Sequence, residues 1–187
     1  IYVKDSLGRQ YIDGISSLWN VCLGHKNKEV IDAITEQLNE LEYFSLYGYS
    51  NKPSIELAQK ISEFTGNYYK RFFFTNSGSE AVDTAIKIVR QYFKNKGEGK
   101  KTKIISLINS FHGVTFGAMS VGGIPVDSEK FQPVLEGFKK IPPPYCYRCD
   151  YKKVYPQCHL ACAKELEEVI LEEGPETIAA FVAEPIL

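Results

Sequence analysis

The sequence predicts an α/β protein with a mostly parallel sheet flanked by helices. Three short, continuous apolar runs, at residues 72–74, 103–108 and 177–185, have the character of strands buried on both faces. Segments with helical spacing of apolar residues lie between these runs, and strands that alternate with helices are typical of a parallel sheet. The length of 187 residues, with 44% apolar and 24% charged residues, fits one large globular domain or a domain and a fragment.

The first 65 residues predict a hairpin and two helices. Residues 2–4 and 9–13 flank a turn for which Gly8 supplies the glycine. Asn27 can cap a helix, and a second helix is expected at about residues 54–65. The apolar side chains of the first helix fall on one face at Val30, Ile31, Ile34, Leu38 and Leu41.

From residue 72 onward, strands and helices alternate. The expected elements are a strand at 72–74, a helix at 79–95, a strand at 103–108, a short helix at 114–121, a loop at 142–160, a helix at 161–173 and a strand at 177–185. Ligands of open α/β sheets bind beyond the carboxyl ends of the strands. The three polar corners that follow the strands should therefore be neighbours in space.

The first corner, TNSGSEA at residues 75–81, supports two interpretations. Ser77 and Glu80 match a capping box, in which the serine accepts a hydrogen bond and the glutamate reaches back. The same helix start offers free N–H groups and the positive end of a dipole, which suit a phosphate, with Gly78 for close approach and Ser79 as a second hydroxyl. A carboxylate at Glu80 opposes a phosphate unless it points away, so the segment alone favours a plain cap.

The other two corners carry an aromatic ring and a carboxylate. Phe111 follows the strand at 103–108, where it offers a flat apolar face to another ring, and Gly113 would let that ring come close. His112 could bind a ring substituent or the backbone. Glu184 ends the last strand, where an ionised carboxylate needs a partner, either within the fold or on a polar cofactor. Together the corners describe a site for a phosphorylated aromatic ring.

Composition and charge exclude several other classes of function. The formal charge is 22 minus 23, or −1, which gives no reason to expect nucleic acid or an acidic membrane as a partner. No window approaches about 18 uninterrupted apolar residues, and the start has no basic-then-apolar leader. We therefore expect a cytoplasmic protein with reduced thiols.

The segments YIDGISSLWNVCLGH, FFFTNSGSEAVDTAIKIVR, NSFHG and VAEPI, in that order, resemble the class III aminotransferases, which use pyridoxal phosphate. The resemblance covers the whole chain. It implies the fold-type I architecture of pyridoxal-phosphate-dependent transferases. Residues 1–45 would then be an N-terminal segment of the small domain region, and residues 46–187 the first half of the cofactor-binding large domain.

The resemblance assigns roles to individual residues. Phe111 would stack on the pyridine ring, and Trp19 would line the substrate pocket. Tyr47, in an aromatic loop, could contribute to that pocket, to a dimer contact or to core packing. The complete set of expected cofactor-binding residues is Ser77, Gly78, Ser79, Phe111, His112, Gly113 and Glu184.

The resemblance also implies catalytic groups that this chain does not hold. Both ends look cut, since the chain lacks an initial Met and stops in an apolar run. The family's Schiff-base lysine, and the aspartate that pairs with the pyridine nitrogen, lie downstream of Leu187. We therefore assign no catalytic residue here and expect the 187-residue chain alone not to transaminate.

The activity implied for the intact protein is amino-group transfer from an omega-amino acid, amine or diamine to a keto acid or aldehyde. The diaminopelargonate step of biotin synthesis is one candidate, and the family is homodimeric. Two alternatives stay open: another reaction on the same cofactor fold, such as decarboxylation or racemisation, and a non-catalytic metal-binding module organised by cysteines.

Four of the five cysteines lie within 17 residues, as Cys146-x₂-Cys149 and Cys158-x₃-Cys162. This spacing could form a tetrahedral thiolate zinc site, whereas free cysteines also occur as small buried apolar residues. The mammalian 4-aminobutyrate aminotransferases carry an iron–sulfur centre on a Cys-x-x-Cys, so a metal is not foreign to the family. The sequence leaves these alternatives open, and no metal ligand is assigned.

Overall fold

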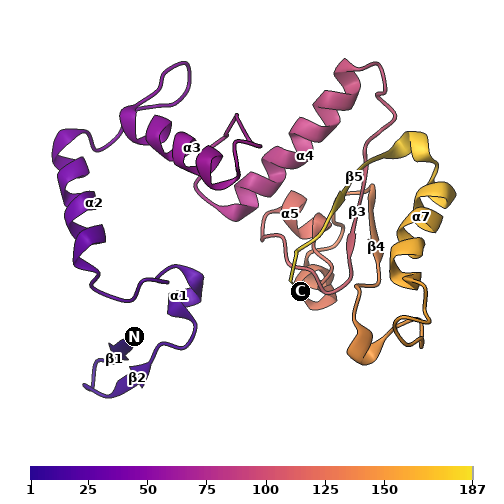
Figure 1. The fold of residues 1–187 in the computed structure, drawn as a ribbon, viewed down its shortest axis with the longest axis horizontal. Helices are drawn as coiled ribbons and strands as arrows, with labels where there is room; N and C mark the ends of the chain where they lie inside the picture. The colour runs from indigo at the N-terminus through magenta and orange to yellow at the C-terminus, as the bar shows by residue number, and fades with distance from the viewer. Residues whose placement is uncertain (187) are drawn as a thin grey trace. The chain divides into compact units, whose positions relative to one another are not determined.

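The computed structural model describes residues 1–186, apart from the side chains of residues 126 and 127. The chain divides into two compact units, Ile1–Phe72 and Phe73–Leu187 (Figure 1). No helix among the described residues has both the length and the apolar character that crossing a membrane requires.

The first unit contains the predicted hairpin and helices. Its elements are β1 (Tyr2–Lys4), β2 (Gln10–Ile12), α1 (Ser16–Trp19), α2 (Lys28–Glu40) and α3 (Lys52–Phe64). The two strands pair antiparallel, and Gly8 adopts a φ of +80° in their turn, as predicted. Asp5 Oδ1 tightens that turn because it accepts hydrogen bonds of 2.9 Å from the amides of Leu7 and Arg9.

Asparagine caps start both long helices of this unit. Asn27 Oδ1 accepts a 3.1 Å hydrogen bond from Val30 N, which confirms the predicted cap of α2. Asn51 Oδ1 accepts a 3.0 Å hydrogen bond from Ser54 N, so α3 begins two residues before the expected residue 54. The predicted apolar face of α2 is present, yet its side chains remain exposed within the unit.

The second unit is an α/β layer structure. Its helices and strands are α4 (Gly78–Asn95), β3 (Lys103–Leu107), α5 (Phe116–Val121), α6 (Pro125–Ser128), β4 (Phe138–Ile141), α7 (Ala161–Glu173) and β5 (Ile178–Val182). Single 3₁₀ turns occur at η1 (Glu129–Phe131), η2 (Cys146–Arg148) and η3 (Pro175–Thr177). The strands form one sheet in the order β4-β3-β5, and both pairings are parallel, which confirms the predicted α/β class.

Helices cover both faces of this sheet (Figure 1). On one face, Ile104 of β3 packs with Ile86 of α4 and Val121 of α5. On the other face, Ile105 and Leu107 of β3 pack with α7. The central strand β3 is buried on both sides, as its continuous apolar sequence predicts.

The strand predicted at Phe72–Phe74 is absent, and this prediction was wrong. These residues form no strand ladder among the described residues, and Phe73 is 71% exposed. An apolar run indicates that a segment is suited to burial. A strand also requires a neighbouring strand whose backbone groups pair with its own, and the run does not show whether one is present.

Strand β4 was missed by the sequence analysis because its sequence, Phe-Lys-Lys-Ile, is half charged. Each lysine has its own partner on a different face of the sheet. Lys139 pairs with Glu173 at 2.6 Å, on the α7 side. Lys140 donates to Ser106 Oγ at 2.9 Å and to the carbonyls of Ser120 and Val121 at the end of α5.

Candidate functional site

The corner between residue 75 and helix α4 is capped as predicted, with one difference. Ser77 is extended, with φ −150° and ψ 160°, and its Oγ accepts a 3.2 Å hydrogen bond from Glu80 N. The carboxylate of Glu80 reaches back to Asn76 N, at 2.9 Å, one residue before the cap residue itself. The capping box is therefore formed in a slightly extended version.

The cap leaves donors free at the start of α4. Within residues 1–186, the amides of Gly78 and Ser79 make no hydrogen bond. The hydroxyls of Ser77 and Ser79 each accept a hydrogen bond and donate none in that range, so each still has its hydrogen to offer. A helix start with free N–H groups and free hydroxyls suits an anion.

The side chain of Glu80 lies on another flank of this helix start. It lines a depression together with Asp83, Thr84 and Lys87 of α4, whereas Ser79 faces the second corner. The carboxylate is already held by Asn76. The objection that Glu80 would repel an anion at this corner is therefore weakened.

Ser79 joins the first corner to the second. Its Oγ accepts a 3.0 Å hydrogen bond from the amide of Val114. The neighbouring Gly113 has a φ of +135°, and a Cβ there would lie 2.5 Å from Ser79 Oγ and 2.8 Å from Ala118 Cβ. Only glycine permits this close approach of the two segments.

Glu184 joins the second corner to the third. Its Oε1 accepts a 3.1 Å hydrogen bond from the amide of Phe111, so the ends of β3 and β5 are tied side chain to backbone. The carboxylate predicted to need a partner thus has one within the fold. Together with the bond between Ser79 and Val114, this contact brings the three predicted corners to one edge of the sheet.

His112 lies between charged groups of opposite sign. Burial lowers its pKa below the ordinary value; the carboxylate of Glu184 acts against this shift and the ammonium of Lys140 acts with it. A lowered pKa favours the neutral form of the imidazole. Its Nε2 is buried and has no hydrogen-bond partner among the described residues.

An apolar cavity of about 580 Å³ opens beside Phe111. Gly113, Val114 and two further phenylalanines, Phe116 and Phe131, contribute to its walls. The ring of Phe111 is 52% exposed. An aromatic side chain with an open face next to a wide apolar cavity can stack on a planar ligand.

Lys140 is a perturbed group near this edge that the sequence analysis did not identify. Burial lowers its pKa to about 8. Its ammonium is surrounded by the hydroxyl of Ser106 and carbonyl groups of α5, without a carboxylate among its hydrogen-bond partners. Lys140 is buried because it belongs to strand β4, which the sequence analysis did not predict. No local sequence signal could therefore have identified its perturbed pKa.

Trp19 and Tyr47, the expected substrate-pocket candidates, belong to the first unit. Their side chains are 75% and 93% exposed. Their assignment to a substrate pocket stays a prediction.

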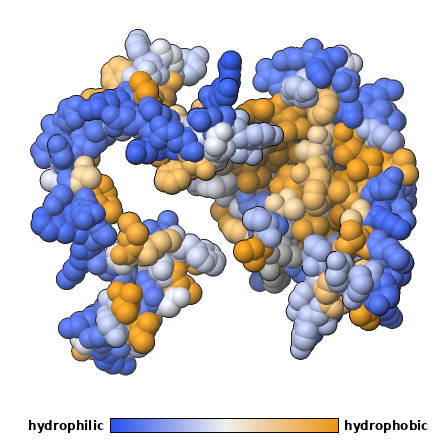
Figure 2. Space-filling model, in the orientation of Figure 1, coloured by the Kyte–Doolittle hydropathy of each residue, from blue (hydrophilic) through white to orange (hydrophobic). Residues whose placement is uncertain are grey.

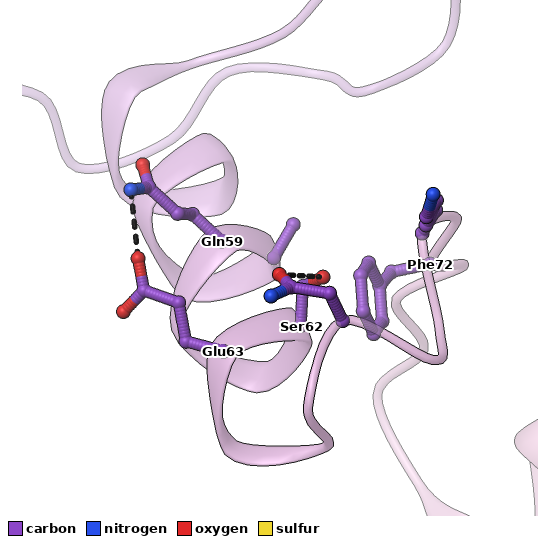
Figure 3. A pocket seen from close by; sticks show the side chains of 7 residues that line it. Gln59, Ser62, Glu63 and Phe72 are labelled. Atoms are coloured by element: carbon purple, nitrogen blue, oxygen red, sulfur yellow. Dashed lines mark hydrogen bonds between the residues drawn. The ribbon is translucent and has the colours of Figure 1, made fainter.

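The first unit has a polar depression of its own, of about 340 Å³, near the end of α3 (Figure 3). Two hydrogen bonds link polar groups in its wall: Gln59 Nε2 donates to Glu63 Oε1 at 2.9 Å, and Ser62 Oγ donates to Asn67 Oδ1 at 3.4 Å.

Comparison with known proteins gives a consistent result. The model of the family described as aminotransferase class-III matches residues 1–187. The adenosylmethionine-8-amino-7-oxononanoate aminotransferase of Anoxybacillus flavithermus is 39% identical over 187 residues, which are 100% of this chain and 41% of that protein.

Solved structures agree. The omega transaminase of Pseudomonas jessenii in complex with PMP superposes with a TM-score of 0.95 at 40% identity, covering 100% of this chain and 42% of that one. A PLP-bound amine transaminase from an uncultivated Pseudomonas species gives a TM-score of 0.92 at 38% identity, covering 98% and 42%. The chain therefore spans about two fifths of the length of these relatives.

Proposed function

Because the chain belongs to the class-III aminotransferase family, we propose that the whole protein is an aminotransferase that uses pyridoxal phosphate. The family match confirms the resemblance found in the sequence, and the structural matches confirm the fold-type I architecture. The amino donor would be an omega-amino acid, amine or diamine, and the acceptor a keto acid or aldehyde. The names of the relatives, which include an oxononanoate aminotransferase and omega transaminases, support this range.

The observation that carries the proposal is the pair of hydrogen bonds that unites the three corners. Val114 N donates to Ser79 Oγ at 3.0 Å, and Phe111 N donates to Glu184 Oε1 at 3.1 Å. A helix start with free donors, an open aromatic face and a carboxylate thus share one edge of the sheet. These are the groups that a phosphorylated pyridine ring requires.

The start of α4 would hold the phosphate of the cofactor. The free amides of Gly78 and Ser79 and the hydroxyl hydrogens of Ser77 and Ser79 supply the donors. Gly78 has no atom within 4 Å of the position a Cβ would take, so the approach to these donors is open. The residues present therefore fit the group.

The end of β3 would hold the ring of the cofactor. Phe111 would stack on one face of the ring, and Gly113 removes a side chain that would otherwise separate this wall from Ser79. His112 offers a buried Nε2 without a partner among the described residues, which fits a hydrogen bond to a polar group that arrives with the ligand. Glu184 would orient Phe111 and add negative charge to this edge.

Bound pyridoxal phosphate supplies the electron sink for amino-group transfer. This chain binds and orients the cofactor in our proposal, and no residue of it is assigned to the proton transfer or to covalent attachment. Those roles, the homodimer implied by the family and the cytoplasmic location expected from the cysteine count and the missing leader are proposals for the whole protein. Trp19 is proposed to line the substrate pocket there.

A matched pair of glycine variants tests this proposal. Gly78→Val places a branched side chain beside the free donors of α4, whereas Gly99→Val changes a glycine that also has open space around it but lies in a distant turn. We expect Gly78→Val in the whole protein to weaken binding of pyridoxal phosphate at least tenfold, or about 1.4 kcal/mol. Gly99→Val should bind normally. Absorbance titration measures the affinity, and circular dichroism checks that helix content is unchanged.

Undiminished affinity in Gly78→Val would mean that this corner is only a helix cap. Equal loss in both variants would point to general destabilisation and would likewise count against the proposed phosphate site.

A further inference from the structure

Residues 16–19, which include Trp19, form a single turn of left-handed helix. Their φ angles all lie between +49° and +64°, and the ψ angles of Ser17 and Leu18 are +52° and +54°. The amide of Trp19 donates to Ile15 O at 2.8 Å, which closes the turn. The element labelled α1 in Figure 1 therefore has the hand opposite to that of an ordinary α-helix.

This conformation is unfavourable for the residues that adopt it. In the left-handed region the Cβ of an L-residue comes too close to the following carbonyl oxygen, so such residues normally occur there singly. None of the four is glycine, asparagine or aspartate, the residues that tolerate this region best. The longest other run of positive φ among non-glycine residues within residues 1–186 has two members, His159 and Leu160. A run of four therefore requires contacts that oppose its relaxation.

Asp13 supplies such contacts from just before the turn. Its Oδ1 accepts hydrogen bonds from the amides of Ile15 at 3.3 Å and Ser17 at 3.0 Å. Its Oδ2 accepts a 3.1 Å hydrogen bond from the Ser17 hydroxyl and lies 2.8 Å from His25 Nε2. The hydrogen bonds from the Ser17 amide and from His25 lower the pKa of Asp13 to about 2, so the carboxylate is ionised at neutral pH.

Polar contacts, and not apolar packing, hold the turn within the first unit. Leu18 and Trp19 are 61% and 75% exposed, so neither side chain anchors the turn by burial. The side chain of Asp13, in contrast, is only 9% exposed. After the turn, Asn20 Nδ2 donates to Leu18 O at 3.1 Å and Cys22 Sγ donates to Trp19 O at 3.3 Å. These two contacts bind carbonyl groups, whereas Asp13 binds the amides at the start of the turn.

We propose that Asp13 is a positioning residue for Trp19. Its carboxylate holds residues 16–19 in the left-handed conformation and thereby fixes the direction of the indole. Without the carboxylate the turn would relax toward the right-handed region, which is favoured for residues with a side chain, and the indole would move.

A consequence for substrate choice follows, and it rests on the proposed function, in which Trp19 lines the substrate pocket. A displaced indole would leave more room in that pocket. Amine donors with a bulky substituent would then gain relative to small amines, because pocket size discriminates between substrates that differ in apolar volume.

Asp5 provides a matched control in the same unit. It accepts hydrogen bonds from the amides of Leu7 and Arg9 at 2.9 Å, from Arg9 Nε at 2.6 Å and from the Tyr11 hydroxyl at 3.1 Å. Asp5 and Asp13 thus each hold a turn through two amides, a hydroxyl and a basic side chain. The turn at Asp5 has its positive φ at a glycine, so it contains no run of strained residues.

Fluorine NMR of the whole protein, labelled with fluorotryptophan, tests the position of the indole. The signal of Trp19 is identified by its loss in Trp19→Phe. We expect Asp13→Ala to shift or broaden this signal and Asp5→Ala to leave it unchanged. Asp13→Asn should stay close to the original position, because the amide oxygen still accepts hydrogen bonds from the two backbone amides.

An unchanged signal in Asp13→Ala would overturn the proposal. An equal displacement in Asp5→Ala would overturn it too, since that result would indicate general loosening of the unit. If Asp13→Ala does not fold, Ser17→Ala takes its place, because it removes the 3.1 Å hydroxyl contact and keeps the amide contact. It should displace the signal by a smaller amount, and an unchanged signal would then overturn the proposal.

Kinetics with two amine donors test the consequence for substrate choice. The measured quantity is kcat/KM for an aryl-substituted amine divided by kcat/KM for a small aliphatic amine, a ratio that does not depend on the fraction of folded enzyme. We expect the ratio to rise about tenfold in Asp13→Ala and in Trp19→Ala, and to stay constant in Asp5→Ala. A ratio that changes in Trp19→Ala but not in Asp13→Ala would overturn the proposal. Absence of turnover in the unmodified whole protein would instead count against the proposed function, and the fluorine signal would still decide the role of Asp13.

Discussion

Gly113 combines two constraints that only glycine satisfies. Its φ of +135° is a strained region for any residue with a side chain, and a Cβ there would contact Ser79 within 2.5 Å. Gly97 has a positive φ of +80° as well, but has no atom within 4 Å of its Cβ position. A side chain at Gly97 would therefore cause backbone strain alone, whereas a side chain at Gly113 would cause both backbone strain and overpacking.

We expect Gly97→Ala to lower the free energy of unfolding by about 1–2 kcal/mol, from backbone strain alone. Gly113→Ala should lower it by at least about 3 kcal/mol, because strain and overpacking add, and should also weaken pyridoxal phosphate binding. Urea unfolding of both variants measures the difference. Equal losses in the two variants would contradict the close approach of residues 113 and 79.

Lys140 is a second residue whose environment decides its behaviour. Burial lowers its pKa from the ordinary value of 10.5 to about 8. Between pH 8 and 10.5 the unfolded chain holds this proton while the folded chain has released it. The free energy of unfolding therefore rises as pH increases from about 8 to 10.5, because the folded chain no longer holds a buried charge at Lys140. As pH falls from 10.5 to about 8, this contribution of Lys140 is lost.

Replacement of Lys140 by Met should remove this contribution. The variant should show a smaller rise in the free energy of unfolding between pH 8 and 10.5 than the unmodified protein, measured by urea unfolding at several pH values. Lys139→Met serves as the control because Lys139 lies on the opposite face and pairs with Glu173. An identical pH dependence in Lys140→Met and the unmodified protein would show that the ammonium is not buried.

At the scale of elements, the start of helix α4 is compatible with both interpretations of the TNSGSEA corner, a helix cap and an anion-binding site. Ser77 and Glu80 cap the helix, yet the amides of Gly78 and Ser79 make no hydrogen bond within the described residues. A capping box satisfies only part of the four free N–H groups at a helix start. Capping and anion binding can thus occur at the same helix start.

Two substitutions of Ser77 separate these roles. Ser77→Ala should lower the free energy of unfolding by about 1 kcal/mol because the cap is lost. Ser77→Asp should keep that stability, since aspartate is also a good cap, but its carboxylate should repel the cofactor phosphate and weaken binding. Chemical unfolding and a cofactor titration measure the two effects. Normal cofactor binding in Ser77→Asp would contradict the proposed phosphate site.

At the scale of the whole molecule, apolar surface remains exposed in both units. Figure 2 shows apolar surface over the middle of the second unit, where edge strand β5 lies between α4 and α7, and Phe181 of β5 is 43% exposed. The apolar face of α2 is also exposed within the first unit. The chain spans about two fifths of the length of its relatives, and contiguous exposed apolar patches commonly mark interaction surfaces.

The 187-residue chain alone should not transaminate. With pyridoxal phosphate, an amine donor and pyruvate, we expect no amino product above the rate of the cofactor without protein, because the family's lysine is not among the assigned residues. The whole protein, assayed alongside, should form product. Turnover by the 187-residue chain would contradict this prediction, and a cofactor-induced shift in its absorbance would show that its binding edge is nevertheless formed.

The sequence by itself determined the α/β class, the parallel arrangement, the hairpin and the caps at Asn27 and Ser77. These features depend on local periodicity and on side chains that bond to backbone two or three residues away, so a short window contains their cause. The sequence also singled out residues 77–79, 111–113 and 184 as a candidate site, since ligand sites in such sheets follow the strand ends. Their role in binding stays a prediction.

The tertiary structure alone decided which segments pair and which side chains meet. Within residues 1–186 it left Phe72–Phe74 without a strand partner, added the half-charged strand β4, and buried Lys140 against the end of α5. It also joined Ser79 to Val114 and Phe111 to Glu184, over separations of 35 and 73 residues. Strand partners and buried charges depend on neighbours that are distant in the chain, so no local pattern contains them.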